Sequence, residues 1–169
     1  MHDSESLSNK ELLTPDLIGL VADLLQKNGW FLASAESCTG GMIAAACTDL
    51  AGSSNWFERG FVTYSNAAKT ESLGVAASLI AEHGAVSEPV ASAMAAGALR
   101  HSHAQVSVAV TGVAGPSGGS AAKPVGTVWF GFAVPGRVIT EQRHFAGDRA
   151  AVRAATVQHA LTRLLELLA

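Results

Sequence analysis

Three side chains that can act as nucleophiles lie together in a short turn, AESCTGG, at Ala35 to Gly41. Ser37, Cys38 and Thr39 bring two hydroxyls and one thiol, and two glycines follow them. The apolar run before the turn predicts a strand, and the apolar residues from Met42 predict a buried helix. A helix N-terminus offers free N–H groups and the positive end of a dipole. A nucleophile in this turn is therefore expected beside groups that stabilise an anion.

A serine becomes a nucleophile when a base removes its proton. No histidine lies in a motif-like setting near a predicted strand end, which argues against a serine–histidine–acid triad. Lysine can replace histidine where burial or a neighbouring positive charge keeps it neutral. Lys69 is the candidate, because it follows a predicted strand end that carries Tyr64, whose hydroxyl could pass a proton or hold the amine. Taken alone, the residues favour an ordinary solvated helix lysine.

Cys38 is the rival nucleophile, since a thiol at a helix N-terminus has a lowered pKa and is intrinsically reactive. The alternative is a small buried residue, and Thr39 can equally be no more than a helix cap. Cys38 and Cys47 fall on nearly opposite faces of the predicted helix and are poor disulfide partners. This cysteine usage predicts a cytoplasmic protein.

A glycine-rich loop, Thr111 to Gly119, follows an apolar run that suits a buried strand. Successive N–H groups in such loops bind anions, so the loop and nearby Lys123 could hold a phosphate or stabilise an oxyanion. The alternative is a plain flexible connection. Arg149 and Arg153 share a face of the last predicted helix, where they could bind a phosphate together or form surface ion pairs.

The elements that position these residues predict an α/β fold, a three-layer α/β/α sandwich with a mixed parallel/antiparallel sheet. Residues 1–13 are expected to form an N-terminal tail, and residues 14–169 one domain. Thr14 is the predicted cap of the first helix and Asp148 that of the last. Strands are predicted over 30–33, 61–64, 106–110, 127–134 and 138–145, and helices over 14–28, 42–50, 67–73, 76–82, 87–103 and from 148 onward.

Composition predicts a globular domain, because 49% of the 169 residues are apolar and 15% are charged. The net charge of −3, with no basic patch, argues against nucleic acid as a partner. No apolar run is long enough to span a bilayer, and the polar first residues lack a signal-peptide core. His101 and His103 lack the cysteines or carboxylates of a zinc site. The faces rich in alanine and glycine are compatible with a homodimer.

Six sequence blocks in order resemble the C-terminal domain of the competence/damage-inducible protein CinA. The match runs from about Leu17 to the C-terminus. The blocks are AESCTGG, GFVTYSNAAK (Gly60 to Lys69), GAVS (Gly84 to Ser87), TGVAGPSGG (Thr111 to Gly119), KPVGTVW (Lys123 to Trp129) and GDR (Gly147 to Arg149).

This resemblance implies deamidation of nicotinamide mononucleotide to nicotinate mononucleotide and ammonia, in pyridine-nucleotide salvage. It implies a Ser-Lys dyad of Ser37 and Lys69, assisted by Tyr64, and so overturns the preference for a solvated lysine. No metal or other cofactor is implied. The oxyanion and the substrate, with its 5′-phosphate, are assigned to Thr39, Gly40, Gly41, Thr111, Gly112, Gly115, Gly118, Gly119, Lys123 and Arg149.

Two other functions are considered. One is a non-catalytic nucleotide-binding or interaction module of a competence or DNA-damage response. The presence of Ser37, Tyr64 and Lys69 together argues against it. The other is an amidase with the same dyad that acts on a different small amide. The expected partner is the small-molecule substrate, nicotinamide mononucleotide, and neither nucleic acid nor a membrane is expected.

Overall fold

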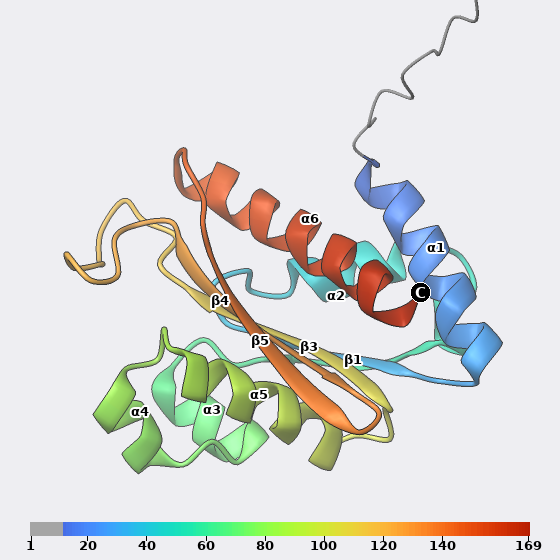
Figure 1. Ribbon diagram of the computed structural model, residues 1–169, viewed down its shortest axis with the longest axis horizontal. Coiled ribbons are helices and arrows are strands. Elements are labelled where there is room, and N and C mark those ends of the chain that lie inside the picture. The colour runs from blue at the N-terminus through green and yellow to red at the C-terminus, as the bar shows by residue number, and fades with distance from the viewer. Residues whose placement is uncertain (1–11) are drawn as a thin grey trace, which may run out of the picture.

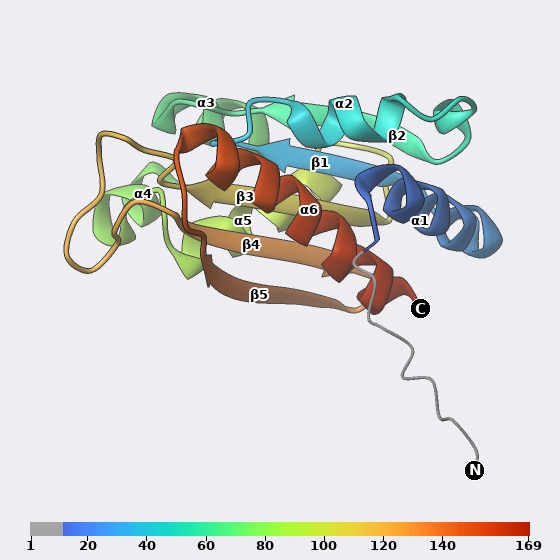
Figure 2. The same cartoon turned by 90° about the horizontal axis from the view of Figure 1, so that it is seen from above.

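The computed structural model describes residues 12–169, in which one five-stranded sheet lies between two layers of helices (Figures 1 and 2). The strand order is β2-β1-β3-β4-β5. β1 is parallel to both β2 and β3, whereas β4 runs antiparallel to both of its neighbours, β3 and β5. The predicted three-layer sandwich with a mixed sheet is confirmed. The strands are β1 Leu32–Glu36, β2 Phe57–Val62, β3 Val106–Gly112, β4 Thr127–Val134 and β5 Arg137–His144.

The helices divide between the two faces of the sheet (Figure 2). One face carries α1 Thr14–Asn28, α2 Met42–Thr48 and α6 Arg149–Leu168. The other carries α3 Asn66–Leu73, α4 Ala77–His83 and α5 Glu88–Arg100, and a short 3₁₀ helix, η1 Ser53–Asn55, precedes β2. Each face has its own buried apolar cluster, so the central strands are covered on both sides.

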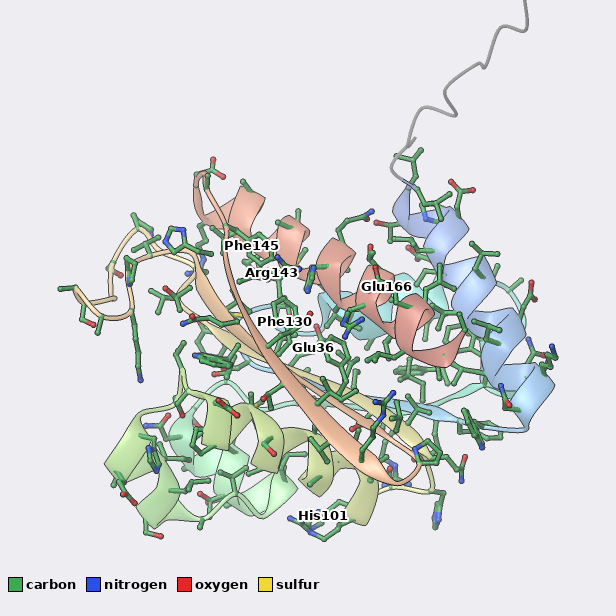
Figure 3. The ribbon with its side chains drawn as sticks, viewed as in Figure 1. Glu36, His101, Phe130, Arg143, Phe145 and Glu166 are labelled. Carbon is green, nitrogen blue, oxygen red and sulfur yellow. The ribbon has the colours of Figure 1, made fainter. Side chains whose placement is uncertain are left out.

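The two faces of the sheet differ in side-chain size. Val128, Phe130 and Phe132 of β4 point toward α6, and the Phe130 ring packs 4.7 Å from that of His159, centroid to centroid (Figure 3). On the opposite face, Gly131 lies so close to α5 that an added Cβ would be 2.4 Å from the Ala91 carbonyl oxygen. The period-2 alternation of β4 therefore places Phe130 and Phe132 beneath α6, and Gly131 and Ala133 beneath α5.

Helix capping confirms one sequence expectation and corrects another. Asp148 caps α6, because its carboxylate accepts a hydrogen bond from the Ala151 N–H at 2.9 Å. The prediction for Thr14 is wrong, since the cap of α1 is Leu13 and no side chain bonds there. The Thr14 hydroxyl instead donates to Gln158 Oε1 at 2.7 Å, which ties α1 to α6.

The predicted N-terminal tail falls almost entirely on residues 1–11, which lie outside the described residues. Within residues 12–169, no helix is long and apolar enough to cross a membrane. The boundary between tail and domain stays a prediction from the sequence.

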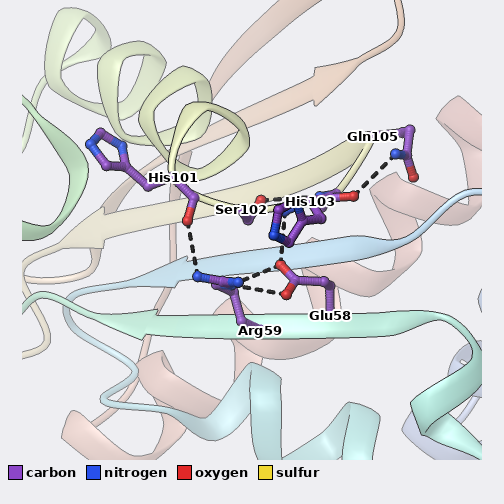
Figure 4. A network of polar contacts seen from close by, with 7 residues as sticks. Glu58, Arg59, His101, Ser102, His103 and Gln105 are labelled. Atoms are coloured by element: carbon purple, nitrogen blue, oxygen red, sulfur yellow. Dashed lines mark hydrogen bonds and ion pairs between the residues drawn. The ribbon is translucent and has the colours of Figure 1, made fainter.

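A polar network joins the edge strand β2 to the turn that follows α5 (Figure 4). The Glu58 carboxylate accepts from Arg59 Nε at 2.8 Å and from the His103 N–H at 3.1 Å. Arg59 Nη1 donates to the His101 carbonyl oxygen at 3.1 Å. The imidazoles of His101 and His103 point in different directions, and residues 12–169 hold no group of three or more His, Cys, Asp or Glu suited to a metal.

Candidate active site

Ser37 lies where the parallel strands of the sheet end. It follows β1 directly, and its N–H donates to the Val110 carbonyl oxygen of β3 at 3.0 Å. Thr63 and Tyr64 follow the end of β2 at the same edge. Because the carboxyl ends of parallel strands form the usual ligand site of an open α/β sheet, the fold brings these residues to one place. The Ser37 side chain is largely buried, with 8% of the residue exposed.

Lys69 reaches Ser37 from the first half of α3 and is itself 1% exposed. Its Nζ donates to Ser37 Oγ at 3.0 Å, to the Thr63 carbonyl oxygen at 3.0 Å and to the Tyr64 carbonyl oxygen at 3.3 Å. Among the residues described, no carboxylate pairs with this amine. Burial lowers the pKa of Lys69, which favours the neutral amine that can accept the Ser37 proton.

The Tyr64 side chain does not hold the lysine amine, contrary to one sequence expectation. Tyr64 is 61% exposed, and its hydroxyl accepts from Arg149 Nη2 at 3.1 Å. Only its backbone carbonyl contacts Lys69. The phenol lies at the rim of the site, where it would meet a bound molecule.

The expected low pKa of Cys38 is wrong. Burial raises the pKa of this thiol to about 11, and the negative charge of Glu36 raises it further. A thiol with this pKa is almost fully protonated at neutral pH and is a poor nucleophile. Of the two adjacent candidates, Ser37 is the one with a base within hydrogen-bond distance.

Glu36 is a central residue that the sequence analysis missed. It lies in the interior of the molecule and is fully buried (Figure 3). Its carboxylate accepts from the Thr39 hydroxyl at 2.6 Å, from the Ile43 N–H at 2.8 Å and from the Ala44 N–H at 3.1 Å. The end of a buried strand just before a helix is the one sequence signal for this role.

The Thr39 hydroxyl and the Ile43 and Ala44 N–H groups donate to Glu36, so they are not free to donate to a ligand. Gly40 is also occupied, since its N–H donates to the Ser37 carbonyl oxygen at 3.1 Å. Gly41 is the N-cap of α2, with φ of 108°, and does not line the cavity beside Ser37. The two glycines shape the turn. The N-terminus of α2, which was expected to stabilise an anion formed on the substrate, instead binds the carboxylate of Glu36.

A cavity of about 190 Å³ lies beside Ser37 and Lys69. Thr111 and Gly112 form part of its wall, and the Thr111 hydroxyl donates to the Ala85 carbonyl oxygen at 3.0 Å. A Cβ on Gly112 would lie 2.7 Å from Val128 Cγ2, so close packing requires glycine there. The lining residues are Ser37, Cys38, Tyr64, Asn66, Lys69, Ala85, Val86, Thr111, Gly112, Ala114 and Arg149.

A second hollow of about 480 Å³ adjoins this cavity and shares Ala114 and Arg149 with it. Arg149 Nη1 donates to the Gly115 carbonyl oxygen at 2.9 Å. The lining residues are Ala114, Pro116, Val125, Gly147, Asp148, Arg149, Ala150 and Arg153.

Like Thr39, Gly40 and Gly41, four predicted binding residues of the glycine-rich loop and its continuation line neither hollow, namely Gly115, Gly118, Gly119 and Lys123. Gly115 is buried, and its carbonyl oxygen accepts from Arg149. Gly118 and Gly119 are exposed in the loop that extends beyond the sheet (Figure 1). Lys123 Nζ donates to the His83 carbonyl oxygen at 2.7 Å and so ties the loop to the end of α4. These residues shape the loop and do not face the cavity.

Comparison with known proteins matches this architecture to one family. The model of the CinA C-terminal domain matches residues 15–168. A protein of Enterobacter agglomerans named nicotinamide-nucleotide amidohydrolase PncC is 62% identical over 130 residues, covering 76% of this chain and 79% of the relative. The protein of that name from Escherichia coli K12 is 54% identical over 145 residues, covering 85% and 88%. A solved CinA superfamily structure from Escherichia coli superposes with a TM-score of 0.90 at 38% identity, covering 96% of this chain and 94% of that one.

Proposed function

The chain belongs to the CinA C-terminal domain family, and we propose that it hydrolyses the amide of nicotinamide mononucleotide to nicotinate mononucleotide and ammonia. The observation that carries the proposal is the 3.0 Å bond between Lys69 Nζ and Ser37 Oγ. The two bonded residues would provide a serine nucleophile and a buried base, in a chain similar to two proteins named nicotinamide-nucleotide amidohydrolase. Pyridine-nucleotide salvage is the corresponding pathway.

The first half of the reaction is acyl transfer to the serine. Neutral Lys69 takes the Ser37 proton while Oγ attacks the carboxamide carbon, and the carbonyl oxygen becomes an oxyanion. The protonated amine then gives its proton to the leaving nitrogen, the C–N bond breaks and ammonia departs. Ser37 remains as an acyl ester. The surrounding carbonyl groups of Thr63 and Tyr64 orient the lysine through both steps.

Water completes the reaction by the same proton path. Lys69 takes a proton from the attacking water, a second oxyanion forms, and its collapse returns the proton to Ser37 and releases the carboxylate. Because the Ile43 and Ala44 N–H groups bond to Glu36, the proposed oxyanion position is not at α2 but against the cavity wall that includes Cys38, Gly112 and Ala114. No step requires a metal or another cofactor.

A purely binding module explains this site less well. Burying a lysine without a carboxylate partner is unfavourable, and a module that only bound nucleotide would gain nothing from it. The pair of Ser37 and Lys69 accounts for that burial as a base held in its neutral form. A cytoplasmic location and a homodimer remain predictions from the sequence.

The test is ammonia release from nicotinamide, its riboside, its mononucleotide and the dinucleotide. Activity is expected with the mononucleotide. Ser37→Ala and Lys69→Ala should lose about 10³-fold or more in kcat/KM, and Cys38→Ala should stay within about threefold of the wild type. Binding without ammonia release would support the module, and activity on another amide alone would support the alternative amidase. Activity in Ser37→Ala with loss in Cys38→Ala would reverse the nucleophile assignment.

A further inference from the structure

The hollow next to the candidate active site has two positively charged side chains in its wall. Arg149 and Arg153 line it together, and Asp148 is its one acidic lining residue. That carboxylate already accepts the Ala151 N–H as the cap of α6. Within residues 12–169, neither arginine forms an ion pair with a carboxylate. The wall therefore carries a net positive charge that the described protein leaves unneutralised.

Both guanidinium groups are held in place by neutral oxygens. Arg153 donates from Nε to the Cys38 carbonyl oxygen at 3.1 Å and from Nη2 to that of Thr39 at 3.3 Å. Arg149 donates to the carbonyl of Gly115 and to the Tyr64 hydroxyl. A guanidinium has five N–H donors, so each keeps donors for a ligand. Fixed, positively charged donors are suited to the oxygens of a phosphate.

The position of the hollow indicates which part of a ligand it holds. The cavity beside Ser37 measures about 190 Å³, below the roughly 300–1,000 Å³ of a typical small-molecule pocket. A ligand larger than its reacting ring must extend outward, and the larger hollow adjoins the cavity at Ala114 and Arg149. The reacting amide and a distant anionic group would then occupy the two hollows.

We propose that Arg153, together with Arg149, binds the phosphate monoester of the substrate, so that this hollow selects the nucleotide over its nucleoside. The inference rests on the proposed function. It replaces Lys123 and the tip of the glycine loop as the phosphate site, because the Lys123 amine bonds to His83. Since Arg153 also holds the carbonyl groups that follow Ser37, a bound phosphate would fix the turn that carries the nucleophile.

The test compares binding of nicotinamide mononucleotide and nicotinamide riboside by calorimetry in a Ser37→Ala background, where no turnover occurs. Adding Arg153→Ala should weaken mononucleotide binding about 10- to 100-fold and riboside binding less than threefold. Arg153→Lys should recover part of the loss. Arg163→Ala is the matched control, because Arg163 lies on the same helix but pairs with Glu141.

Two results would overturn the inference. Equal weakening of both ligands in Arg153→Ala and Arg149→Ala would mean that these residues only support the turn. A loss confined to Lys123→Ala would return the phosphate to the loop. Ammonia release by the wild type is measured in parallel, so that failure of the proposed reaction is separable from failure of this subsite.

Discussion

At the scale of single residues, the site is organised by the burial of one amine. Lys69 is 1% exposed and, within residues 12–169, its amine bonds only to neutral oxygens, so its surroundings penalise the charged form. The proposed reaction requires a neutral base beside Ser37, and burial of Lys69 favours the neutral amine. Glu36 is kept away from the amine by its bonds to Thr39 and α2. Glu36 and Lys69, the two buried ionisable residues of this region, thus have separate sets of partners.

Cys38 should be unreactive in the folded protein. A rise in its pKa from 9.0 to about 11 lowers the thiolate fraction at neutral pH about 100-fold, and burial limits access further. Iodoacetamide at pH 7.5 should therefore label native Cys38 at least about 100-fold more slowly than the urea-unfolded chain, as followed by peptide mass spectrometry. Labelling at equal rates in the folded and unfolded protein would contradict the buried, protonated thiol.

At the scale of elements, close contact between α3 and α5 positions Lys69. Gly97 of α5 lies against the end of α3, where an added Cβ would be 2.1 Å from the Leu73 carbonyl oxygen. Gly97→Ala should push α3 away, lowering the free energy of unfolding by roughly 1–3 kcal/mol and kcat by about tenfold or more. Urea unfolding and ammonia release measure the two effects.

Gly19→Ala is the matched control for Gly97, since Gly19 also lies within a helix but has no atom within 4 Å of the added Cβ. Alanine there should raise the free energy of unfolding by about 0.5–1 kcal/mol and leave kcat unchanged. If both substitutions stabilise the protein, α3 is not held by this contact.

The start of α2 depends on Glu36. Glu36→Ala would leave the Thr39 hydroxyl and two N–H groups of α2 without their acceptor, at a cost of roughly 3 kcal/mol in the free energy of unfolding. Glu36→Gln keeps the shape and part of the bonding, so it should lose less. Thermal unfolding ranks the two variants. A Glu36→Ala protein as stable as the wild type would show that α2 forms independently of this carboxylate.

The sequence predicted secondary structure correctly where that structure depends on neighbouring residues and not on distant ones. The period-2 pattern gave the bounds of β4, 127–134, and Asp148 was identified as the cap of α6. The predicted strand 30–33 begins two residues and ends three residues before β1, because Ser34 and Glu36 are polar although buried. Burial of Glu36, and the contact of Arg153 with the Cys38 carbonyl 115 residues away, arise from tertiary packing.

The sequence predicted only part of the candidate site, because the rest depends on contacts between residues that are far apart in the chain. Six motif blocks identified Ser37 and Lys69, and the structure places them 3.0 Å apart. The same blocks did not distinguish Lys123, which bonds to the end of α4, from Arg149, which lines both hollows. A motif marks residues that matter to the fold or to the chemistry, and only their contacts separate the two.

At the scale of the whole molecule, the layers explain how a small domain can bury a lysine. Helices cover both faces of the sheet, and apolar clusters fill both interfaces. Lys69, the proposed base, thus extends from α3, which packs against α5, toward the end of β1. The hydrophobic stability of the two clusters offsets the unfavourable burial of Lys69, a trade that is common at catalytic sites.

This arrangement makes the stability of the whole domain depend on pH through Lys69. Its pKa is lowered from 10.5 in the folded state by burial, so the unfolded chain binds more protons between the lowered value and 10.5. Lys69 should therefore add a rise in the free energy of unfolding with pH across that window, by at most about 1.4 kcal/mol per pH unit. The raised pKa values of Cys38 and Cys47 act in the opposite direction from about pH 9 upward, so the contribution of Lys69 is read as the difference between the wild type and Lys69→Met. In Lys69→Met this rise should be missing, whereas Lys27→Met, at an exposed position on α1, should keep it. Urea unfolding from pH 7 to pH 10 measures all three proteins. Parallel curves for the wild type and Lys69→Met would mean that Lys69 is charged in the folded protein, and with it the proposed base would be lost.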